Sequence, residues 1–231
     1  MDAAMIFSVI FGSLGNISDE DKMTLQAATA KRSGPPSLVV MGRLRKYKGV
    51  QDAIRAMTIL KHQCPDAKLH ILGQGDYEDD LHKLVASLRL EDRCIFHGYV
   101  PVEEKTRMIR EAHVLVMPSY KEGFATPVFE AGLACTPSVA SDAVGVVDSV
   151  EDGVSGLIYP MGNHKKLAEA VARLLLDEEL RERMGQKARE RAQVLEKMYS
   201  QESSFVSEVE STLYGLVGRT PSVIEGTPVT K

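Results

Sequence analysis

Short apolar runs alternate along the chain with longer stretches in which apolar residues recur at helical spacing. Six runs rich in Val, Ile and Leu predict strands. The run Leu38-Val39-Val40-Met41 is apolar at consecutive positions, which is typical of a parallel strand buried on both faces. Helical spacing follows, for example at 50–60, 81–88 and 167–175. The alternation predicts an α/β fold with a doubly wound parallel sheet. The strands are predicted at 38–41, 68–72, 94–97, 114–117, 138–140 and 157–159.

The same pattern divides the chain into three predicted regions. Residues 1–36 form an N-terminal arm and linker, in which Ser18 and the acids after it predict the start of a helix over 22–31. Residues 37–200 form the α/β domain. Residues 201–231 form an amphipathic helix and a loose tail. The apolar stripe of that helix consists of Phe205, Val209, Leu213 and Leu216.

Composition narrows the classes of protein to consider. The chain has 231 residues and 44% hydrophobic residues, enough for a sizeable core. A net charge of −4 argues against a dedicated nucleic-acid binder, and no apolar run approaches the roughly 20 residues that span a bilayer. Peripheral membrane association stays open. Cys64, Cys94 and Cys135 lie far apart, which predicts reduced thiols and a cytoplasmic protein.

The loop after the first predicted strand is rich in cations. Ligands of open parallel sheets bind beyond the carboxyl ends of the strands, so such loops are where chemistry is expected. Arginine offers a fork of donors for phosphate oxygens and lysine a mobile charge, so the loop suits a diphosphate. A solvated basic loop is the alternative. Its cations are Arg43, Arg45, Lys46 and Lys48.

The loop after the second strand contains Gly73-Gln74-Gly75, which permits close approach of a ligand or a tight turn into the next helix. A dinucleotide fingerprint needs a third glycine where Glu78 stands, so no nicotinamide or flavin cofactor is expected. Glu78, Asp79 and Asp80 fit the first turn of a helix better than a cation site. The histidines show no close pairing in the sequence, so no metal site is predicted.

The segment 118–130 carries the strongest signal. It follows a strand and opens a helix, with Thr126 as the predicted N-cap and Pro127 at the first helical position. Free amides around 123–126 are expected to face the same crevice as the cationic loop. Glu122 and Glu130 frame these amides, an arrangement that suits a polyhydroxylated ligand carrying phosphate. Taken singly, each acid also fits a structural role in a loop or on a helix surface.

These motifs together resemble the C-terminal, donor-binding domain of glycosyltransferase family 4, which has the GT-B fold. The resemblance covers roughly Ser37 to Arg191. It implies a Rossmann-like half of a GT-B enzyme, here with a C-terminal helical extension. The motifs are Gly42-Arg43, Lys48-Gly49, Gly73-x-Gly75, Phe96-x-Gly98, Pro118-Ser119, Glu122-Gly123-Phe124, Glu130-Ala131, Thr136-Pro137 and Asp152-Gly153-x-x-Gly156.

The resemblance also implies roles for individual residues. Arg43 and Lys48 match the pair that neutralises the donor diphosphate, and Glu122 matches the acid near the reaction centre. Glu130 matches the acid that binds the ribose hydroxyls. Neither a metal nor another cofactor is implied beyond the nucleotide sugar, such as a UDP- or GDP-sugar. The implied donor-binding set is Gly42, Arg43, Lys48, Gly73, Tyr99, Val100, Gly123, Phe124, Ala125, Thr126 and Glu130.

The expected function is hexosyl transfer from a nucleotide sugar, with retention of configuration and without a metal. A family member also has an N-terminal acceptor domain, whereas only a short segment precedes the cationic loop here. Catalysis in such folds depends on positioning both substrates, so we expect an acceptor-domain partner. The alternative is a non-catalytic module that binds a nucleotide or nucleotide sugar, or an interaction subunit.

Overall fold

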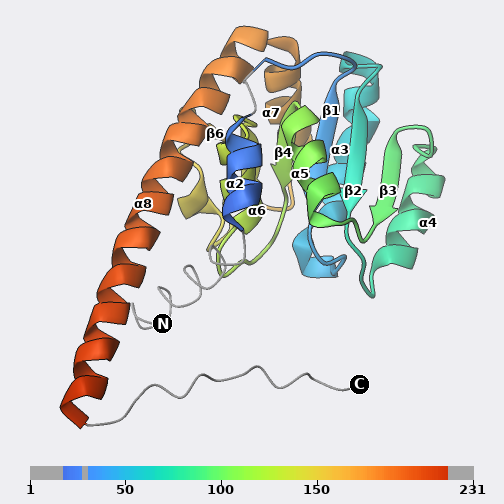
Figure 1. The fold of residues 1–231 in the computed structure, drawn as a ribbon. Coiled ribbons are helices and arrows are strands. Elements are labelled where there is room, and N and C mark those ends of the chain that lie inside the picture. Colours follow the sequence, from blue (N-terminus) through green and yellow to red (C-terminus); the bar gives the residue numbers. More distant parts are fainter. Residues whose placement is uncertain (1–17, 28–30, 218–231) are drawn as a thin grey trace. The chain divides into compact units, whose positions relative to one another are not determined.

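The computed structural model describes residues 18–27 and 31–217, with side chains up to 197. It divides at residue 194 into two units, and the α/β unit precedes this point. Six strands form one parallel sheet in the order β3-β2-β1-β4-β5-β6 (Figure 1). All six predicted strands are confirmed to within one residue at each end. They are β1 (Ser37–Met41), β2 (Lys68–Leu72), β3 (Cys94–Gly98), β4 (Val114–Met117), β5 (Ser138–Ser141) and β6 (Gly156–Tyr159).

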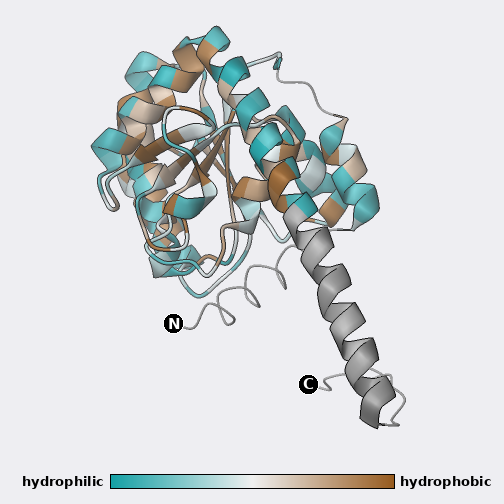
Figure 2. Cartoon of the chain, turned by 90° about the vertical axis from the view of Figure 1, so that its left-hand side faces the viewer, coloured by the Kyte–Doolittle hydropathy of each residue, from teal (hydrophilic) through white to brown (hydrophobic). Residues whose placement is uncertain are grey.

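Helices cover both faces of the sheet, which confirms the doubly wound architecture. On one face lie α3 (Val50–Gln63), α4 (Glu78–Leu88) and α7 (His164–Leu176), whose apolar sides join the strands in a common core. The other face is covered by α2, α5 and α6 (Figure 1). Figure 2 shows hydrophobic residues concentrated in the strands and hydrophilic residues on the outward turns of the helices. The bounds of the second layer are α2 (Asp19–Gln26), α5 (Val102–Glu111) and α6 (Thr126–Leu133).

The strand order places the loops after β1 and β4 side by side. The chain moves outward from β1 through β2 to β3, then crosses back to β4 and continues to β5 and β6. At such a switch point the following loops diverge to opposite faces and leave a crevice between them. The short η1 helix (Lys46–Lys48) lies in the first of these loops.

Helix α2 packs within the α/β unit. The amide of Asp21 donates to Ser18 Oγ at 3.1 Å, which confirms the predicted N-cap. The helix ends at Gln26 rather than at Lys31, so its predicted extent is wrong. Leu25 is buried, and α2 contacts both α5 and α6. Because burial of this apolar side chain ties α2 to the second layer, part of the expected arm contributes to the domain.

At the amino ends of the strands, polar side chains bond to backbone. Arg32 donates to the carbonyl oxygens of Ala112 and Ala134 and to Thr136 Oγ1, each at 2.8 Å. The Ser37 amide donates to His113 Nδ1 at 3.2 Å. Burial lowers the pKa of His113 to about 4, so this ring is neutral and accepts at neutral pH. At this edge of the sheet, these polar side chains therefore use their hydrogen-bonding groups within the protein.

Helix α8 runs from Glu178 to Val217 as one element, so the expected domain boundary at 200 falls inside a helix. Its early residues Leu180 and Met184 are buried. A Cβ added at Gly132 of α6 would lie 2.8 Å from the Ala188 carbonyl oxygen, which records a close helix–helix approach. The predicted stripe from Phe205 to Leu216 and the predicted tail lie outside the residues whose side chains are described.

Candidate functional site

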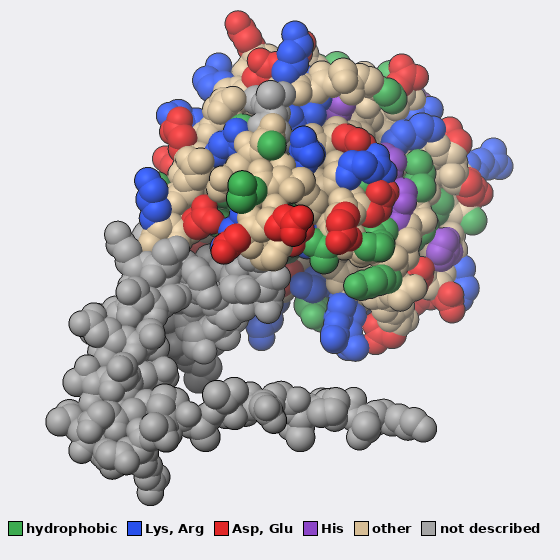
Figure 3. All heavy atoms as spheres, in the orientation of Figure 1, with side chains coloured by type: hydrophobic (Ala, Val, Ile, Leu, Met, Phe, Trp, Pro, Cys, Tyr) green, Lys and Arg blue, Asp and Glu red, His purple; other side chains and the backbone are tan. Residues whose placement is uncertain are grey.

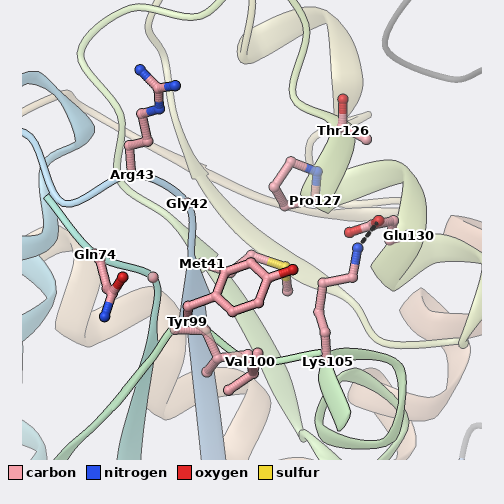
Figure 4. A pocket seen from close by; sticks show the side chains of 12 residues that line it. Met41, Gly42, Arg43, Gln74, Tyr99, Val100, Lys105, Thr126, Pro127 and Glu130 are labelled. Carbon is pink, nitrogen blue, oxygen red and sulfur yellow. Dashed lines mark hydrogen bonds and ion pairs between the residues drawn. The ribbon is translucent and has the colours of Figure 1, made fainter. Parts of the chain in front are cut away.

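The carboxyl edge of the sheet holds an open cavity of about 510 Å³. It lies among the loops after β1, β2 and β3 and the first turns of α5 and α6 (Figure 4). Seven of the residues predicted to bind a donor line it. These are Gly42, Arg43, Gly73, Tyr99, Val100, Thr126 and Glu130. The volume lies within the range of ligand pockets, roughly 300–1,000 Å³.

Arg43 stands across this cavity from the acid of α6 (Figure 4). Its backbone position is fixed by neighbouring turns, since the Gly42 amide donates to the Leu72 carbonyl and the Leu44 amide to the Gln74 carbonyl. Within the described part of the chain, the Arg43 guanidinium has no ion pair and no side-chain hydrogen bond. Its five N–H donors are therefore available to a ligand.

Lys48 and Glu122, from the loops after β1 and β4, form an ion pair. Lys48 Nζ lies 2.7 Å and 2.8 Å from the two carboxylate oxygens, and Ser119 Oγ donates to Oε1 at 2.6 Å. The Glu122 side chain is 9% exposed. The structure thus brings together the cation and the acid expected at the reaction centre. They lie outside the lining of the 510 Å³ cavity, as do the predicted residues Gly123, Phe124 and Ala125.

Two glycines hold the loops of this ion pair in backbone contact. Gly49 has φ +70°, and a Cβ there would lie 1.9 Å from the Pro118 carbonyl oxygen. Gly145 has φ +79°, and a Cβ there would lie 2.0 Å from the Glu122 carbonyl oxygen. Both positions therefore require glycine for conformation and for space. The spacing between Lys48 and Glu122 is set by main chain as well as by the ion pair.

The start of α6 differs from the prediction. Thr126 is the first helical residue, and Ala125 is the N-cap without a side-chain cap. The Ala125 carbonyl accepts from the Val128 amide at 2.8 Å, so the helix begins one residue early and Pro127 is its second residue. The Thr126 hydroxyl is therefore not used for capping. Thr126 lines the cavity instead (Figure 4).

Glu130 is paired with a residue that the sequence analysis missed. Lys105 Nζ of α5 lies 2.6 Å from Glu130 Oε1, and the Glu130 side chain is 5% exposed (Figure 4). Burial raises the pKa of Glu130, and Lys105 offsets part of this rise. A lysine near the start of α5 faces the positive end of the helix dipole, which is an unfavourable place without an acidic partner. That misplacement is the one signal in the sequence that points to a partner.

The loop after β3 supplies a wall and a ring at the cavity mouth. Val100 lines the cavity, and Tyr99 is 77% exposed beside it (Figure 4). Pairing between β2 and β3 shifts register after Phe96, so His97 is an extra residue in a bulge. His97 Nε2 lies 2.9 Å from His70 Nδ1 on β2. The bulge and this contact direct the chain into the loop that carries Tyr99.

In the described ranges, no group of three or more His, Cys, Asp and Glu residues is placed to hold a metal ion. Glu78, Asp79 and Asp80 lie in the first turn of α4, as their dipole interpretation predicts. Among the helices that the structure describes, none has the length and hydropathy needed to cross a membrane.

A family model described as "Glycosyl transferases group 1" matches residues 21–191. The chain belongs to this family. The match starts inside α2, upstream of Ser37, where the resemblance noted from the sequence begins. The six-stranded parallel sheet with helices on both faces is the Rossmann-like fold of GT-B glycosyltransferase structures.

Individual relatives agree with this assignment. The chain is 31% identical over 191 residues to an alpha-D-kanosaminyltransferase of Streptomyces kanamyceticus, covering 81% of this chain and 50% of the relative. Sucrose-phosphate synthase of Thermosynechococcus elongatus superposes with a TM-score of 0.69 at 27% identity, over 84% and 49% of the two chains. A mutant of S. aureus TarM, solved with UDP, gives 0.67 at 25% identity, over 79% and 38%. The chain thus spans half or less of the length of each of these three proteins.

Proposed function

We propose that this chain is the donor-binding half of a retaining, metal-independent glycosyltransferase of family 4. It binds a nucleotide sugar and transfers a hexosyl group to an acceptor held by an N-terminal domain or a partner chain. The observation that carries the proposal is the carboxyl edge of the sheet. Arg43 and Lys48 of the loop after β1 lie there with Glu122 and the buried acid Glu130, which follow β4. A cytoplasmic location fits the three reduced, buried cysteines.

Charge explains how the two cations would act. Departure of a nucleoside diphosphate places negative charge on its phosphate oxygens. Arg43 offers a planar fork that binds such oxygens with two parallel hydrogen bonds. Lys48 adds a mobile charge, and its contact with Glu122 keeps it positioned before the donor arrives. Donors that are already oriented stabilise the developing charge without reorganisation at the moment of reaction.

The two acids would bind different parts of the donor. Glu122, held by Lys48 and Ser119, would face the donor sugar and accept hydrogen bonds from its hydroxyls. Glu130 lies in the cavity, where its carboxylate would accept hydrogen bonds from ribose hydroxyls. Lys105 offsets part of the rise that burial causes in the pKa of that carboxyl. Tyr99 and Val100 would lie along the base, and the similar protein TarM was solved in complex with UDP.

The proposal is tested by calorimetric titration of the chain with UDP, GDP and ADP. We expect at least one nucleotide to bind, with an affinity unchanged by EDTA and lowered by salt because the contacts are ionic. The absence of binding by all three would leave only an interaction subunit. Affinity that is lost on adding EDTA would contradict the metal-independent mechanism.

Transfer is tested separately with Glu122→Gln. We expect turnover of the cognate nucleotide sugar, measured with the acceptor-binding partner present, to fall by at least roughly 100-fold. Nucleotide affinity should stay within about threefold, because the phosphate and ribose contacts persist. Binding without turnover by the unaltered chain and its partner would favour the non-catalytic module.

A further inference from the structure

A second open cavity, of about 610 Å³, lies on the carboxyl edge of the sheet. Its walls come from the η1 turn and from the loops after β2 and β4. Among the described residues, the two cavities share no lining side chain. On the face shown in Figure 3, basic and hydrophobic side chains meet along the lower rim, near the carboxyl ends of β1 and β2. The second cavity, called the tyrosine cavity below, is lined by Arg45, Lys46, Tyr47, Asp76, Tyr77 and Tyr120.

One wall of the tyrosine cavity is anchored by buried groups. Tyr120 Oη donates to Asp52 Oδ2 at 2.7 Å and accepts from Gln51 Nε2 at 3.1 Å. Asp52 and Gln51 are themselves buried. The Tyr120 amide donates to the Tyr47 carbonyl oxygen at 2.7 Å, which joins this wall to the next. The position of the Tyr120 ring is therefore set before any ligand binds.

The lining chemistry fits an anionic sugar. Tyrosine combines an apolar ring face, which can stack on the C–H face of a pyranose, with a hydroxyl for hydrogen bonding. Tyr47 is 45% exposed, and its ring lies 5.5 Å from Lys48 Nζ. Arg45 Nη1 forms an ion pair with Asp76 Oδ2 at 3.6 Å. Lys46 Nζ has no ion pair within the described residues, so the cavity carries an uncompensated positive charge.

The tyrosine cavity adjoins the Lys48–Glu122 pair through the chain. Tyr47 directly precedes Lys48, and Tyr120 stands two residues before Glu122. A ligand on these rings would therefore lie against the same two loops that hold the pair. This placement suits the molecule that receives the transferred sugar rather than a remote effector.

We propose that the tyrosine cavity binds an anionic sugar unit of the acceptor. That the ligand is an acceptor rests on the proposed function. Binding of a sugar phosphate to the cavity does not depend on nucleotide binding. The two claims are therefore separable by experiment.

The probes are glucose 6-phosphate, glucose and inorganic phosphate, titrated into the full chain labelled with ¹⁵N. We expect glucose 6-phosphate to shift the amide signals of Tyr47, Asp76 and Tyr120 while those of Gly73 and Thr126 stay unchanged. UDP should give the reverse pattern. Glucose and phosphate should each bind at least about fivefold more weakly than glucose 6-phosphate, because each lacks one half of the recognised chemistry.

Matched tyrosine variants separate the two sites. Tyr47→Ala should weaken glucose 6-phosphate binding about fivefold and leave UDP affinity within about twofold. Tyr99→Ala, which removes an exposed ring from the other cavity, should weaken UDP binding and leave glucose 6-phosphate unaffected. Both side chains are exposed, and a thermal melt checks that each variant folds.

Several results would overturn the inference. These are an absence of shifts with millimolar glucose 6-phosphate, shifts confined to the donor cavity, equal binding of inorganic phosphate, or a Tyr47→Ala variant that binds normally. Sugar-phosphate binding without any nucleotide binding would instead overturn the proposed function and leave the tyrosine cavity as a site.

Discussion

The two edges of the sheet use similar polar residues in opposite ways. At the amino edge, the guanidinium of Arg32 donates hydrogen bonds to two carbonyl oxygens and a hydroxyl, and His113 accepts from a backbone amide. At the carboxyl edge, Arg43 lines a cavity and no described residue takes its donors. The comparison shows that a residue type does not mark a binding site. What matters is whether the fold has already satisfied its hydrogen-bonding groups.

The largest effect is expected from removing the cations of the carboxyl edge. Arg43→Ala combined with Lys48→Ala should weaken nucleotide binding at least about 100-fold, since each charge-assisted contact contributes roughly 1.5–3 kcal/mol. Calorimetry measures the loss. Arg45→Ala combined with Lys46→Ala removes the same charge from the same loop and should change affinity by less than about threefold. Equal losses in the two double variants would mean that the loop acts only through its net charge.

Arg32→Ala probes the opposite edge. Three hydrogen bonds to partly buried acceptors would be lost, so the free energy of unfolding should fall by about 3 kcal/mol. Urea denaturation measures this change. Nucleotide affinity of the folded fraction should be unchanged, whereas Arg43→Ala should weaken binding and barely alter stability. An Arg32→Ala variant of normal stability would show that water replaces these contacts at no cost.

The smallest effect is expected from Lys105→Met. Lys105 lowers the pKa of Glu130 against burial, so its removal should raise that pKa further. Carboxylate binding to ribose is present above the pKa and is lost as the pH falls through it. In the variant, the loss of UDP affinity should therefore begin at a higher pH, with about tenfold weaker binding on the acid side.

Titrations from about pH 5 to about 8 follow this shift. Glu130→Gln is the control, because it has no carboxyl to titrate and its affinity should not vary with the protonation of residue 130. A Lys105→Met profile that matches the unaltered chain would mean that Glu130 does not contact the nucleotide as an anion.

Much of the fold could be predicted from the sequence because the central strands are buried on both faces. Runs such as Leu38–Met41 are apolar at every position, and few other structures accommodate them. The loops after β1 and β4 were found for a topological reason, since ligands of such sheets bind at their switch point. The roles assigned to Glu122 and to the donor-binding residues remain predictions.

What the sequence missed depends on contacts between separate elements. Lys105 lies on α5 and Glu130 on α6, and the sequence around Lys105 suggests an acidic partner without identifying Glu130. The tyrosine cavity needs three loops at once. The predicted start of α6 was wrong by one residue, because the Ala125 carbonyl accepts the first helical hydrogen bond and Ala125, not Thr126, is the N-cap. Helix ends depend on such single bonds, so patterns of residue type locate them only approximately.

The close backbone approach at Gly49 limits how the neighbouring loops can move. Because its backbone lies against Pro118, little room is left for the segment that carries Lys48 to shift against the segment that carries Glu122. Adjustment to an arriving donor then falls to side-chain torsions, above all those of Arg43, because Lys48 is held by Glu122. Such rotations take picoseconds to nanoseconds, orders of magnitude faster than the rearrangement of loops. This half of the fold would be ready for its ligand well before any slower movement of a neighbouring domain.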